Sequence, residues 1–559
     1  MKKLPYGISN YEELITDGYY YVDKTMYIEK LESLPEKRII FLRPRKFGKT
    51  LFTSTLENYY DILKADKFDI LFSNTYIGKN PTKLKNSYCI LKFNFSGINT
   101  SNEDTTMKSL KREVASSIQV FVEKYGLDFF INMEDDTEGI LDNLIKAFSI
   151  QKADSKIYVI IDEYDHFANE LLGFRTNEFK NLVSKNGKVR KLYEILKKGT
   201  ETVVDRIFIT GVAPITLDSL TSGFNIGSDI TQDVDFNEMI GFTQSELITM
   251  LNNLEISKEE QEIILPIMKE NYDGYKFSVN ATKKMYNSNM SLYFLKSYVR
   301  FKTIPSQLID VNIASDYTKL GNMLDLCEVK EREKIIEKTV SGEGLISEIT
   351  AKFNPAIDFG EQDLISILFY LGYLTIVGEN FETPELKIPN RIMKEIYSDY
   401  FIRILNRDTN LQFSSSIYTE MMYEIAMKGK IDKIVNLVQT YLQNLSNRDY
   451  MSFDEKYIKL IFYCIAMNLK IFRIKSEMEV QRKYPDILLI PKDVSKNYKA
   501  VMIEFKYLKK GEYNKLAEKQ EEAKKQIDEY TSFEEIRSIP DLNKYSVVAV
   551  NDKKYVEKV

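Results

Sequence analysis

Short apolar runs alternate with amphipathic stretches over the first 236 residues of the chain. Four of these runs are rich in isoleucine, valine and aromatic residues: 38–42, 88–95, 157–161 and 206–210. Runs of this length and composition are typical of buried parallel strands separated by helices. Residues 1–236 therefore predict an α/β domain built on a parallel sheet.

The pattern changes to amphipathic helices after residue 236, for example over 257–265 and 363–371, so residues 237–446 predict a mostly helical lid or linker region. Beyond residue 447 the pattern predicts a helix over 454–469, three strands, a charged helix and a last strand over 545–550. That order indicates a second, small α/β domain over 447–559. Three domains agree with a chain of 559 residues, at about 100–200 residues each.

Composition narrows the choice of partners and compartment. The net charge is -5, from 77 basic and 82 acidic residues, so a nucleic acid would have to bind a local basic surface. Cys89, Cys327 and Cys464 lie far apart, and His166 is the single histidine, which argues against disulfides and zinc. Without a signal-peptide core or a membrane-length apolar run, we expect a soluble cytoplasmic protein.

The first apolar run leads directly into a loop that ends in Gly48-Lys49-Thr50 and is followed by a helix over 51–63. A strand, a tight loop and a helix are the parts of a Walker A site, in which backbone N–H groups bind the phosphates of ATP. Lys49 would reach the β- and γ-phosphates, and Thr50 would bind Mg²⁺. Arg43 stands where the general pattern has its first glycine, so a basic loop that caps a helix is the alternative.

The strand predicted over 157–161 ends in Asp162-Glu163, as in a Walker B site. Asp162 would bind the water shell of the magnesium ion, and Glu163 would polarise an attacking water. Thr210 ends the next strand, where a γ-phosphate sensor would lie. A Walker A pattern and a Walker B pattern, each after an apolar strand and in the right order, favour nucleotide binding over an ordinary acidic turn.

Two other features have simpler interpretations. We expect residues 21–25 to form a turn with a solvated pair between Asp23 and Lys24, although a nucleotide contact is the alternative. We expect His166 to be a surface or packing residue, because no partner for a general base is evident.

The last domain carries a second constellation of charged residues. Glu504 and Lys506 form an E-x-K pattern on a strand, and alternation puts both on one face. Asp486 precedes the strand before it, so an antiparallel hairpin would bring Asp486 beside Glu504. This is the arrangement of the PD-(D/E)XK nucleases. The alternative is a solvated Glu-Lys pair on an edge strand.

The chemistry of such a site follows from its charges. Two carboxylates about 4 Å apart repel by roughly 4 kcal/mol at an effective dielectric near 20, and a magnesium ion between them removes that repulsion. The ion would activate water and polarise the scissile phosphate, while Lys506 stabilises developing charge. Glu477 would add a ligand or act as base, and Glu455 would complete the metal shell. Gln526 and Tyr530 share one helix face in a Q-x-x-x-Y pattern and would flank a nucleic-acid strand.

Nearly the whole chain resembles AAA-ATPase-like proteins that are fused to a C-terminal PD-(D/E)XK nuclease domain. The stretches that carry the resemblance are YYYVDKTMYIEKL (19–31), RPRKFGKTL (43–51), ILKFNFS (90–96), VIIDEYD (159–165), FITGVAPITLDSLTSGFN (208–225), FNEMIGFTQSEL (236–247), NYDGYKFS (271–278) and FYLGYLTI (369–376). The resemblance implies an AAA-like fold in which arginine is usual at the first Walker A position. It implies ATP and Mg²⁺ as cofactors, bound through Arg43, Gly48, Lys49, Thr50, Asp162 and Glu163.

We interpret the chain as an ATP-binding and ATP-hydrolysing protein coupled to Mg²⁺-dependent hydrolysis of nucleic acid, with DNA as the preferred substrate. The pairing of domains suggests defence against mobile elements or phage. The alternative is a non-catalytic, ATP-dependent switch or scaffold whose nuclease-like domain only binds a partner. A pure ATPase motor is a third class. A homo-oligomer is left open, because no arginine finger can be assigned.

Overall fold

The computed structural model describes most of the chain, in two compact units. It describes residues 2–166, 188–215, 226–310, 320, 324, 329–353, 360–411, 415–445, 455–476, 485–493, 495–509, 511–550 and 553–559. One unit comprises Met1–Val329 with Ile346–Arg391, and the other comprises Lys330–Leu345 with Ile392–Val559. The predicted domain boundaries at residues 236 and 446 stay predictions.

A five-stranded parallel sheet forms the centre of the first unit, in the order β2-β3-β4-β1-β5. The strands are β1 (Arg38–Leu42), β2 (Tyr88–Asn94), β3 (Lys156–Asp162), β4 (Val204–Gly211) and β5 (Ser228–Asp229). The four long strands match the predicted apolar runs, and their inner residues are buried, as in a sheet covered on both faces. The prediction of a parallel α/β domain is confirmed. The two-residue strand β5 is too short for a periodicity argument to find.

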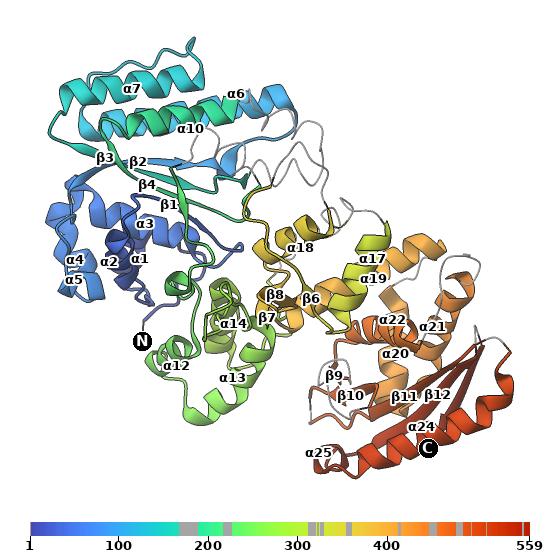
Figure 1. Ribbon diagram of the computed structural model, residues 1–559. Coiled ribbons are helices and arrows are strands. Elements are labelled where there is room, and N and C mark those ends of the chain that lie inside the picture. Colours follow the sequence, from blue (N-terminus) through green and yellow to red (C-terminus); the bar gives the residue numbers. More distant parts are fainter. Residues whose placement is uncertain are drawn as a thin grey trace. The chain divides into compact units, whose positions relative to one another are not determined.

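Helices cover both faces of this sheet (Figure 1). One face carries α6 (Glu103–Tyr125), α7 (Thr137–Gln151) and α10 (Lys188–Gly199). The other carries α1 (Tyr11–Thr16), α2 (Met26–Ser33), α3 (Lys49–Tyr60), α4 (Phe68–Phe72) and α5 (Tyr76–Lys79). The 3₁₀ turns of this part of the chain are η1 (Ile62–Lys67), η2 (Phe95–Gly97) and η3 (Val234–Phe236). Helix α3 begins at the predicted phosphate loop, where Gly48 has φ 105°, a left-handed conformation that glycine adopts without strain.

The helical region of the first unit contains α12 (Gln244–Asn253), α13 (Lys258–Tyr272), α14 (Ser288–Phe301) and α18 (Glu361–Tyr370). Thr243 and Ser257 close capping boxes with Glu246 and Glu260, which explains where α12 and α13 begin. The sequence pattern missed a small sheet here, in which β7 (Thr375–Asn380) and β8 (Thr383–Lys387) form an antiparallel hairpin and β6 (Leu345–Ile346) adds a third strand. The mostly helical character is otherwise confirmed.

The second unit is built on a mixed sheet in the order β13-β12-β11-β10-β9. Its strands are β9 (Phe472–Lys475), β10 (Ile487–Pro491), β11 (Ala500–Leu508), β12 (Leu542–Val550) and β13 (Lys553–Lys558). Strands β11 and β12 are parallel and the other pairs are antiparallel. The sequence predicted all of these strands except β13, whose alternating lysines hide its strand character.

The helices of the second unit are α17 (Val329–Val340), α19 (Arg391–Thr409), α20 (Ser415–Lys428), α21 (Asp432–Leu445), α22 (Glu455–Met467), α24 (Leu516–Thr531) and α25 (Glu534–Arg537), with the turn η5 (Tyr513–Lys515). Helix α24 packs on β11 and β12, and α22 and α20 contact β11 (Figure 1). Along the described residues, no helix has both the length and the apolarity to cross a membrane.

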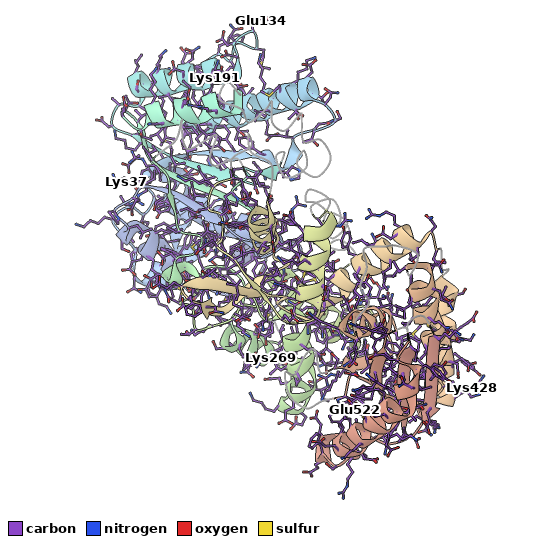
Figure 2. The ribbon with its side chains drawn as sticks, turned by 45° about the vertical axis from the view of Figure 1, so that its right-hand side comes forward. Lys37, Glu134, Lys191, Lys269, Lys428 and Glu522 are labelled. Atoms are coloured by element: carbon purple, nitrogen blue, oxygen red, sulfur yellow. The ribbon has the colours of Figure 1, made fainter. Side chains whose placement is uncertain are left out.

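Charged side chains of both signs lie over the outside of both units (Figure 2). Lys37, Lys191 and Lys428 are exposed examples, as is Glu134. Cys89 and Cys464 are buried and free, and Cys327 lies outside the described residues.

Candidate nucleotide and nuclease sites

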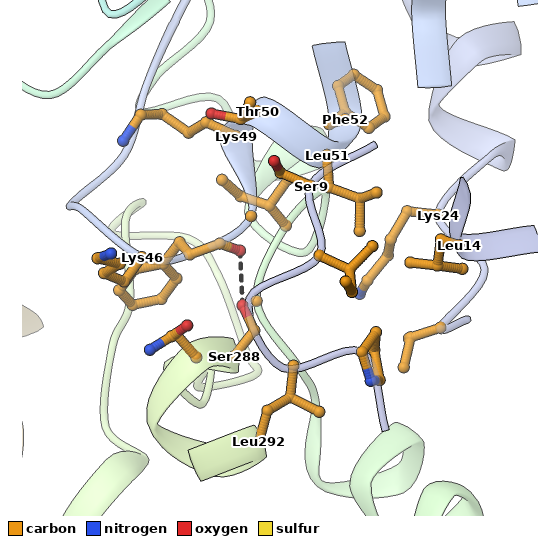
Figure 3. Close-up of a pocket in the computed structure, with 18 of the residues that line it drawn as sticks. Ser9, Leu14, Lys24, Lys46, Lys49, Thr50, Leu51, Phe52, Ser288 and Leu292 are labelled. Atoms are coloured by element: carbon orange, nitrogen blue, oxygen red, sulfur yellow. Dashed lines mark hydrogen bonds between the residues drawn. The ribbon is translucent and has the colours of Figure 1, made fainter. Parts of the chain in front are cut away.

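A cavity of about 550 Å³ lies at the predicted phosphate loop of the first unit. Gly48, Lys49 and Thr50 form part of its wall, and the segment around Ser9 and the start of α14 form other parts (Figure 3). Its apolar lining includes Ile8, Leu14, Phe242, Met250 and Leu292. A cavity that is apolar at one side and carries a phosphate-type loop at the other has the chemistry of a nucleotide pocket.

The Lys49 side chain is folded onto its own loop. Its Nζ donates hydrogen bonds to the carbonyl oxygens of Arg43 at 3.0 Å and Pro44 at 3.2 Å. The same ammonium lies 3.9 Å from Oε1 of Glu163, which also lines the cavity. The loop therefore holds its lysine beside the carboxylate that was predicted to polarise water.

Asp162 and Thr50, the two residues predicted to share a magnesium ion, lie together. Asp162 is fully buried, and its Oδ2 has no hydrogen-bond partner of normal geometry in the described part of the chain. Burial raises the pKa of Asp162, Glu163 raises it further, and the Thr50 hydroxyl and the Lys49 ammonium lower it. A buried carboxylate oxygen with spare acceptor capacity beside a hydroxyl is a suitable ligand pair for Mg²⁺. Glu163 itself has φ 53°, a strained conformation for a non-glycine residue.

Arg43 does not line the cavity, in contrast to the nucleotide contact predicted for it. Its guanidinium is fully buried and lies 4.3 Å from the ring centre of Phe41 and 4.1 Å from that of Phe277. It donates hydrogen bonds to the carbonyl oxygens of Leu42, Thr231 and Phe236 at 2.7–2.9 Å. An arginine side chain here fills the core and pairs buried carbonyl groups, which explains why the loop does without the usual first glycine.

We expect Arg43→Gly, which restores the general Walker A residue, to lower the free energy of unfolding by at least about 3 kcal/mol, because it leaves a cavity and unpaired buried carbonyl groups. Urea denaturation of the full chain measures this change. The matched control is Arg45→Gly, since Arg45 is a partly exposed neighbour in the same loop. We expect the control to cost under about 1 kcal/mol, and equal effects of the two substitutions would contradict a core role for Arg43.

The structure corrects two smaller expectations. The Thr210 hydroxyl donates to the Phe41 carbonyl oxygen at 2.8 Å and does not line the cavity, so it does not face a γ-phosphate. His166 is half-buried in the wall of the cavity, and its surface or packing role stays a prediction. Lys24 is buried and pairs with Glu246 at 2.7 Å, while Asp23 accepts from the Thr25 and Tyr76 backbone N–H groups; the solvated Asp-Lys pair is therefore wrong.

Sequence reasoning missed the contacts that tie the helical region to the phosphate loop. The Ser288 hydroxyl donates to the Phe47 carbonyl oxygen at 2.7 Å (Figure 3). The Gly241 N–H donates to the same oxygen at 3.1 Å. The Asn289 N–H donates to the Lys46 carbonyl oxygen at 3.2 Å. These partners are more than 190 residues apart in the chain, so no local pattern could have indicated them.

In the second unit, the predicted hairpin brings the two acidic residues together. Ile487 on β10 pairs with Ile503 on β11, so the antiparallel register continues to Asp486 opposite Glu504. The Asp486 N–H donates to Glu504 Oε2 at 3.3 Å, and the Phe505 N–H donates to Asp486 Oδ2 at 2.7 Å. Asp486 and Glu504 are only 3% and 2% exposed, which makes this a buried acidic pair and not a solvated one.

Burial and mutual repulsion shift both carboxyl groups. Burial raises the pKa of Asp486 to about 6, and the Lys459 ammonium partly opposes this shift. Burial raises the pKa of Glu504 to about 8, with the Asp486 charge as the second cause and Lys506 in opposition. The two carboxyl groups resist being ionised at the same time. A divalent cation between them would stabilise the state in which both are ionised. A bound cation therefore competes with protons, and its affinity rises as the pH approaches 8.

Lysine side chains surround this pair. Lys506 Nζ lies 3.1 Å from Glu504 Oε1, as the shared strand face predicted. Glu455, at the start of α22, accepts from the Tyr507 N–H at 3.2 Å and so lies next to β11. Sequence reasoning missed Lys459, whose Nζ lies between Asp486 at 2.6 Å and Glu455 at 2.9 Å. Its position four residues after Glu455 on an amphipathic helix was the available signal.

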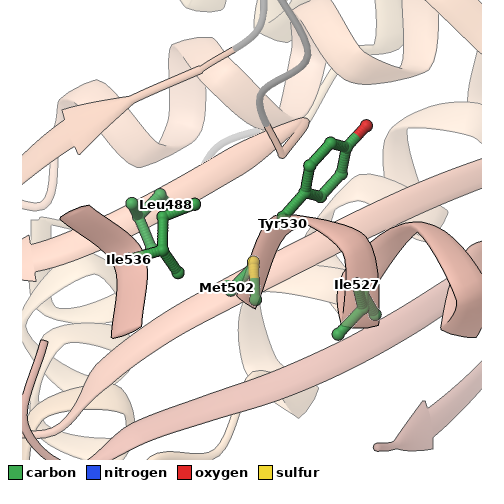
Figure 4. Packing of buried hydrophobic residues seen from close by; sticks show 5 residues of the cluster. All are labelled: Leu488, Met502, Ile527, Tyr530 and Ile536. Atoms are coloured by element: carbon green, nitrogen blue, oxygen red, sulfur yellow. The ribbon is translucent and has the colours of Figure 1, made fainter. Parts of the chain in front are cut away.

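The other residues predicted for the nuclease site do not all line the acidic centre. Glu477 lies outside the described residues. The ring of Tyr530 is 6% exposed and packs in a core cluster with Leu488, Met502, Ile527 and Ile536 (Figure 4). Tyr530 is therefore chiefly a core residue, and its contact with a nucleic-acid strand stays a prediction. Gln526, one turn before it, is half-buried, and its Oε1 has no hydrogen-bond partner in the described part of the chain.

The donor set fits a magnesium ion only in part. No group of three His, Cys, Asp or Glu side chains in the described segments has the spacing of a metal site. The Lys459 ammonium lies between Glu455 and Asp486. Mg²⁺ usually needs only one or two protein carboxylates and completes its shell with water and phosphate oxygens. Asp486 and Glu504 supply that minimum.

Comparison with known proteins places a different family model over each of the two sites. A family model described as a predicted AAA-ATPase matches residues 5–221, and a model of the PD-(D/E)XK nuclease superfamily matches residues 453–558. An uncharacterized protein from the vnfD 5′ region of Azotobacter chroococcum mcd 1 is 24% identical over 390 residues, which are 67% of this chain and 64% of that protein. The match thus spans less than two thirds of the relative. Residues 5–221 therefore form an AAA-ATPase-like domain, and residues 453–558 form a domain of the PD-(D/E)XK nuclease superfamily.

Proposed function

We propose that this protein is an ATP-regulated nuclease that hydrolyses phosphodiester bonds of nucleic acid with Mg²⁺, and that DNA is its substrate. The observation that carries the proposal is the buried pair of Asp486 and Glu504 with Lys506 beside it. Defence against mobile elements or phage is the biological setting we propose for it, in the cytoplasm.

At the first site, we propose that the loop from Gly48 to Thr50 binds the phosphates of ATP and that Lys49 leaves its loop carbonyls for the β- and γ-phosphates. Thr50 and Asp162 would hold the magnesium ion, and Glu163 would polarise the attacking water. The apolar wall around Phe242 and Leu292 suits the base. Ser288, at the start of α14, donates a hydrogen bond to the phosphate loop. A movement of the loop on ATP binding would therefore shift α14 directly.

At the second site, Asp486 and Glu504 would hold a magnesium ion, which would activate water and polarise the scissile phosphate. Lys506 is held by Glu504 on one side and can orient a phosphate oxygen or neutralise charge that develops on it. Burial keeps these groups in fixed positions, so little reorganisation is needed when the substrate binds. Glu477 stays a candidate ligand or base, and Glu455 a candidate outer ligand.

The second candidate is a non-catalytic, ATP-dependent switch or scaffold. One observation favours it: the oxygens of Asp486 and Glu504 already accept hydrogen bonds from protein N–H groups and lysines. A domain with this arrangement would bind a partner without hydrolysing it.

An activity panel on the full chain separates these candidates. We expect Mg²⁺-dependent cleavage of at least one DNA form when labelled single-stranded DNA, duplex DNA and RNA are incubated above pH 7, and a change in its rate on addition of ATP. Asp486→Asn should reduce cleavage by about 10³-fold or more, because a lost metal ligand removes several kcal/mol of transition-state stabilisation.

The matched control is Asp541→Asn in the same unit, since Asp541 is exposed and pairs with Lys499 at 3.0 Å. It should cleave like the wild type. Absence of cleavage for every DNA and RNA form, with and without ATP, would leave the switch or scaffold as the function.

A further inference from the structure

Lys459 occupies a central position in the nuclease centre that neither its sequence pattern nor the family comparison assigns. Its Nζ bridges two carboxylates from different elements, Asp486 Oδ1 before β10 at 2.6 Å and Glu455 Oε1 on α22 at 2.9 Å. The lysine side chain is 17% exposed, while that of Asp486 is 1% exposed. Because the ion pair is largely removed from water, it is stronger than a surface pair.

The hydrogen-bond partners of the three carboxylates show what Lys459 does. Main-chain N–H groups of β11 hold the second oxygens of Asp486 and Glu455. Lys506 and the Asp486 N–H hold the two oxygens of Glu504. Among the described residues, Asp486 Oδ1 and Glu455 Oε1 have only the Lys459 ammonium as a partner. Main-chain groups leave these two oxygens, and Glu504 Oε1 beside Lys506, to the ammonium groups of lysines.

We propose that Lys459 is an internal counter-cation that competes with the divalent metal ion for Asp486 and Glu455. This inference rests on the proposed metal-dependent nuclease. The lysine holds the acidic centre together without metal, and it must leave Asp486 Oδ1 before an ion can bind there. A lysine suits this role because its charge sits on a flexible four-carbon stem.

The proposal has a consequence for substrate binding. A displaced ammonium needs a new anionic partner, and its partial exposure gives it a path to solvent. A phosphate of the nucleic-acid strand beside the metal would be that partner. Metal ion and nucleic acid would therefore bind cooperatively, and the centre would bind metal more weakly in the absence of substrate.

Lys459→Met tests the proposal, because methionine keeps the apolar stem and removes the charge. We expect titration calorimetry of the full chain with Mn²⁺, in the absence of nucleic acid, to show binding roughly tenfold tighter than for the wild type, within the range found for coupled ligands. The metal-free variant should also unfold several degrees lower than the wild type, since Asp486 loses its counter-charge. Addition of Mn²⁺ should restore that loss.

Lys456→Met is the matched control, one turn away on the same helix, where Lys456 pairs with Glu337 and Glu343 instead. Its Mn²⁺ affinity should equal that of the wild type, and Lys459→Arg should bind Mn²⁺ no more tightly than the wild type. Equal or weaker Mn²⁺ binding by Lys459→Met, with the Asp486→Asn variant losing binding, would overturn the role of Lys459 and leave the proposed nuclease intact. Failure of wild type and Lys459→Met alike to bind Mn²⁺ would overturn both.

Discussion

Lys49→Ala should weaken ATP binding by about a hundredfold or more, because its ammonium is the charge best placed to reach the β- and γ-phosphates. In the structure this ammonium forms hydrogen bonds with two loop carbonyls and lies near Glu163. Removing it takes a buried positive charge from the phosphate end of the cavity, which Arg45 and Lys46 also line. Titration calorimetry with ATP in the presence of Mg²⁺ measures the loss of affinity.

Two further variants make this result specific. Lys37→Ala is the matched control, because Lys37 precedes β1 at the end opposite the phosphate loop and pairs with Asp205. It should keep wild-type affinity. Glu163→Gln should bind ATP normally but hydrolyse it at least about a hundredfold more slowly, as expected for loss of a general base. ATP affinity of Lys49→Ala within about fivefold of the wild type would contradict the assignment of the phosphate loop.

Apolar runs were sufficient to predict the four long strands of the sheet in the first unit, but not the two-residue strand β5. Strands such as 38–42 and 157–161 are buried on both faces, so the run of apolar residues is itself the signal. Strand β13 was not predicted because it is an edge strand that is only partly buried, so it carries lysines and a glutamate in place of an apolar run. The hairpin of β7 and β8 is likewise half-exposed and carries polar residues, so its apolar run is short.

The candidate sites were predictable where spacing along one element decides geometry. Glu504 and Lys506 share a strand face, and hairpin register brings Asp486 opposite Glu504. Arg43 was misplaced because a loop pattern does not reveal whether a side chain turns toward the ligand or the core. Here the rings of Phe41 and Phe277 provide the apolar slot, and Phe277 comes from far along the chain. Contacts of this kind depend on tertiary packing.

Lys506→Met should lower the rate of nucleic-acid cleavage by about 10³-fold, which is the loss expected for removal of one charge-stabilising donor. Lys506 is 6% exposed and touches Glu504, so its position is fixed before substrate arrives. Lys499→Met is the matched control, since Lys499 precedes the other end of the same strand and pairs with the exposed Asp541. The control should cleave at the wild-type rate.

The pH dependence separates the role of Lys506 in catalysis from its effect on metal binding. The pKa of Glu504 is raised to about 8 even though the Lys506 ammonium lowers it, so without that ammonium the variant will hold its Glu504 proton to higher pH. Weaker Mn²⁺ binding by Lys506→Met at neutral pH should therefore diminish as the pH rises above 8. The defect in cleavage rate should persist there at saturating metal, because the missing ammonium acts on the phosphate. A rate that recovers together with metal affinity would mean that Lys506 only tunes Glu504 and does not act on the substrate.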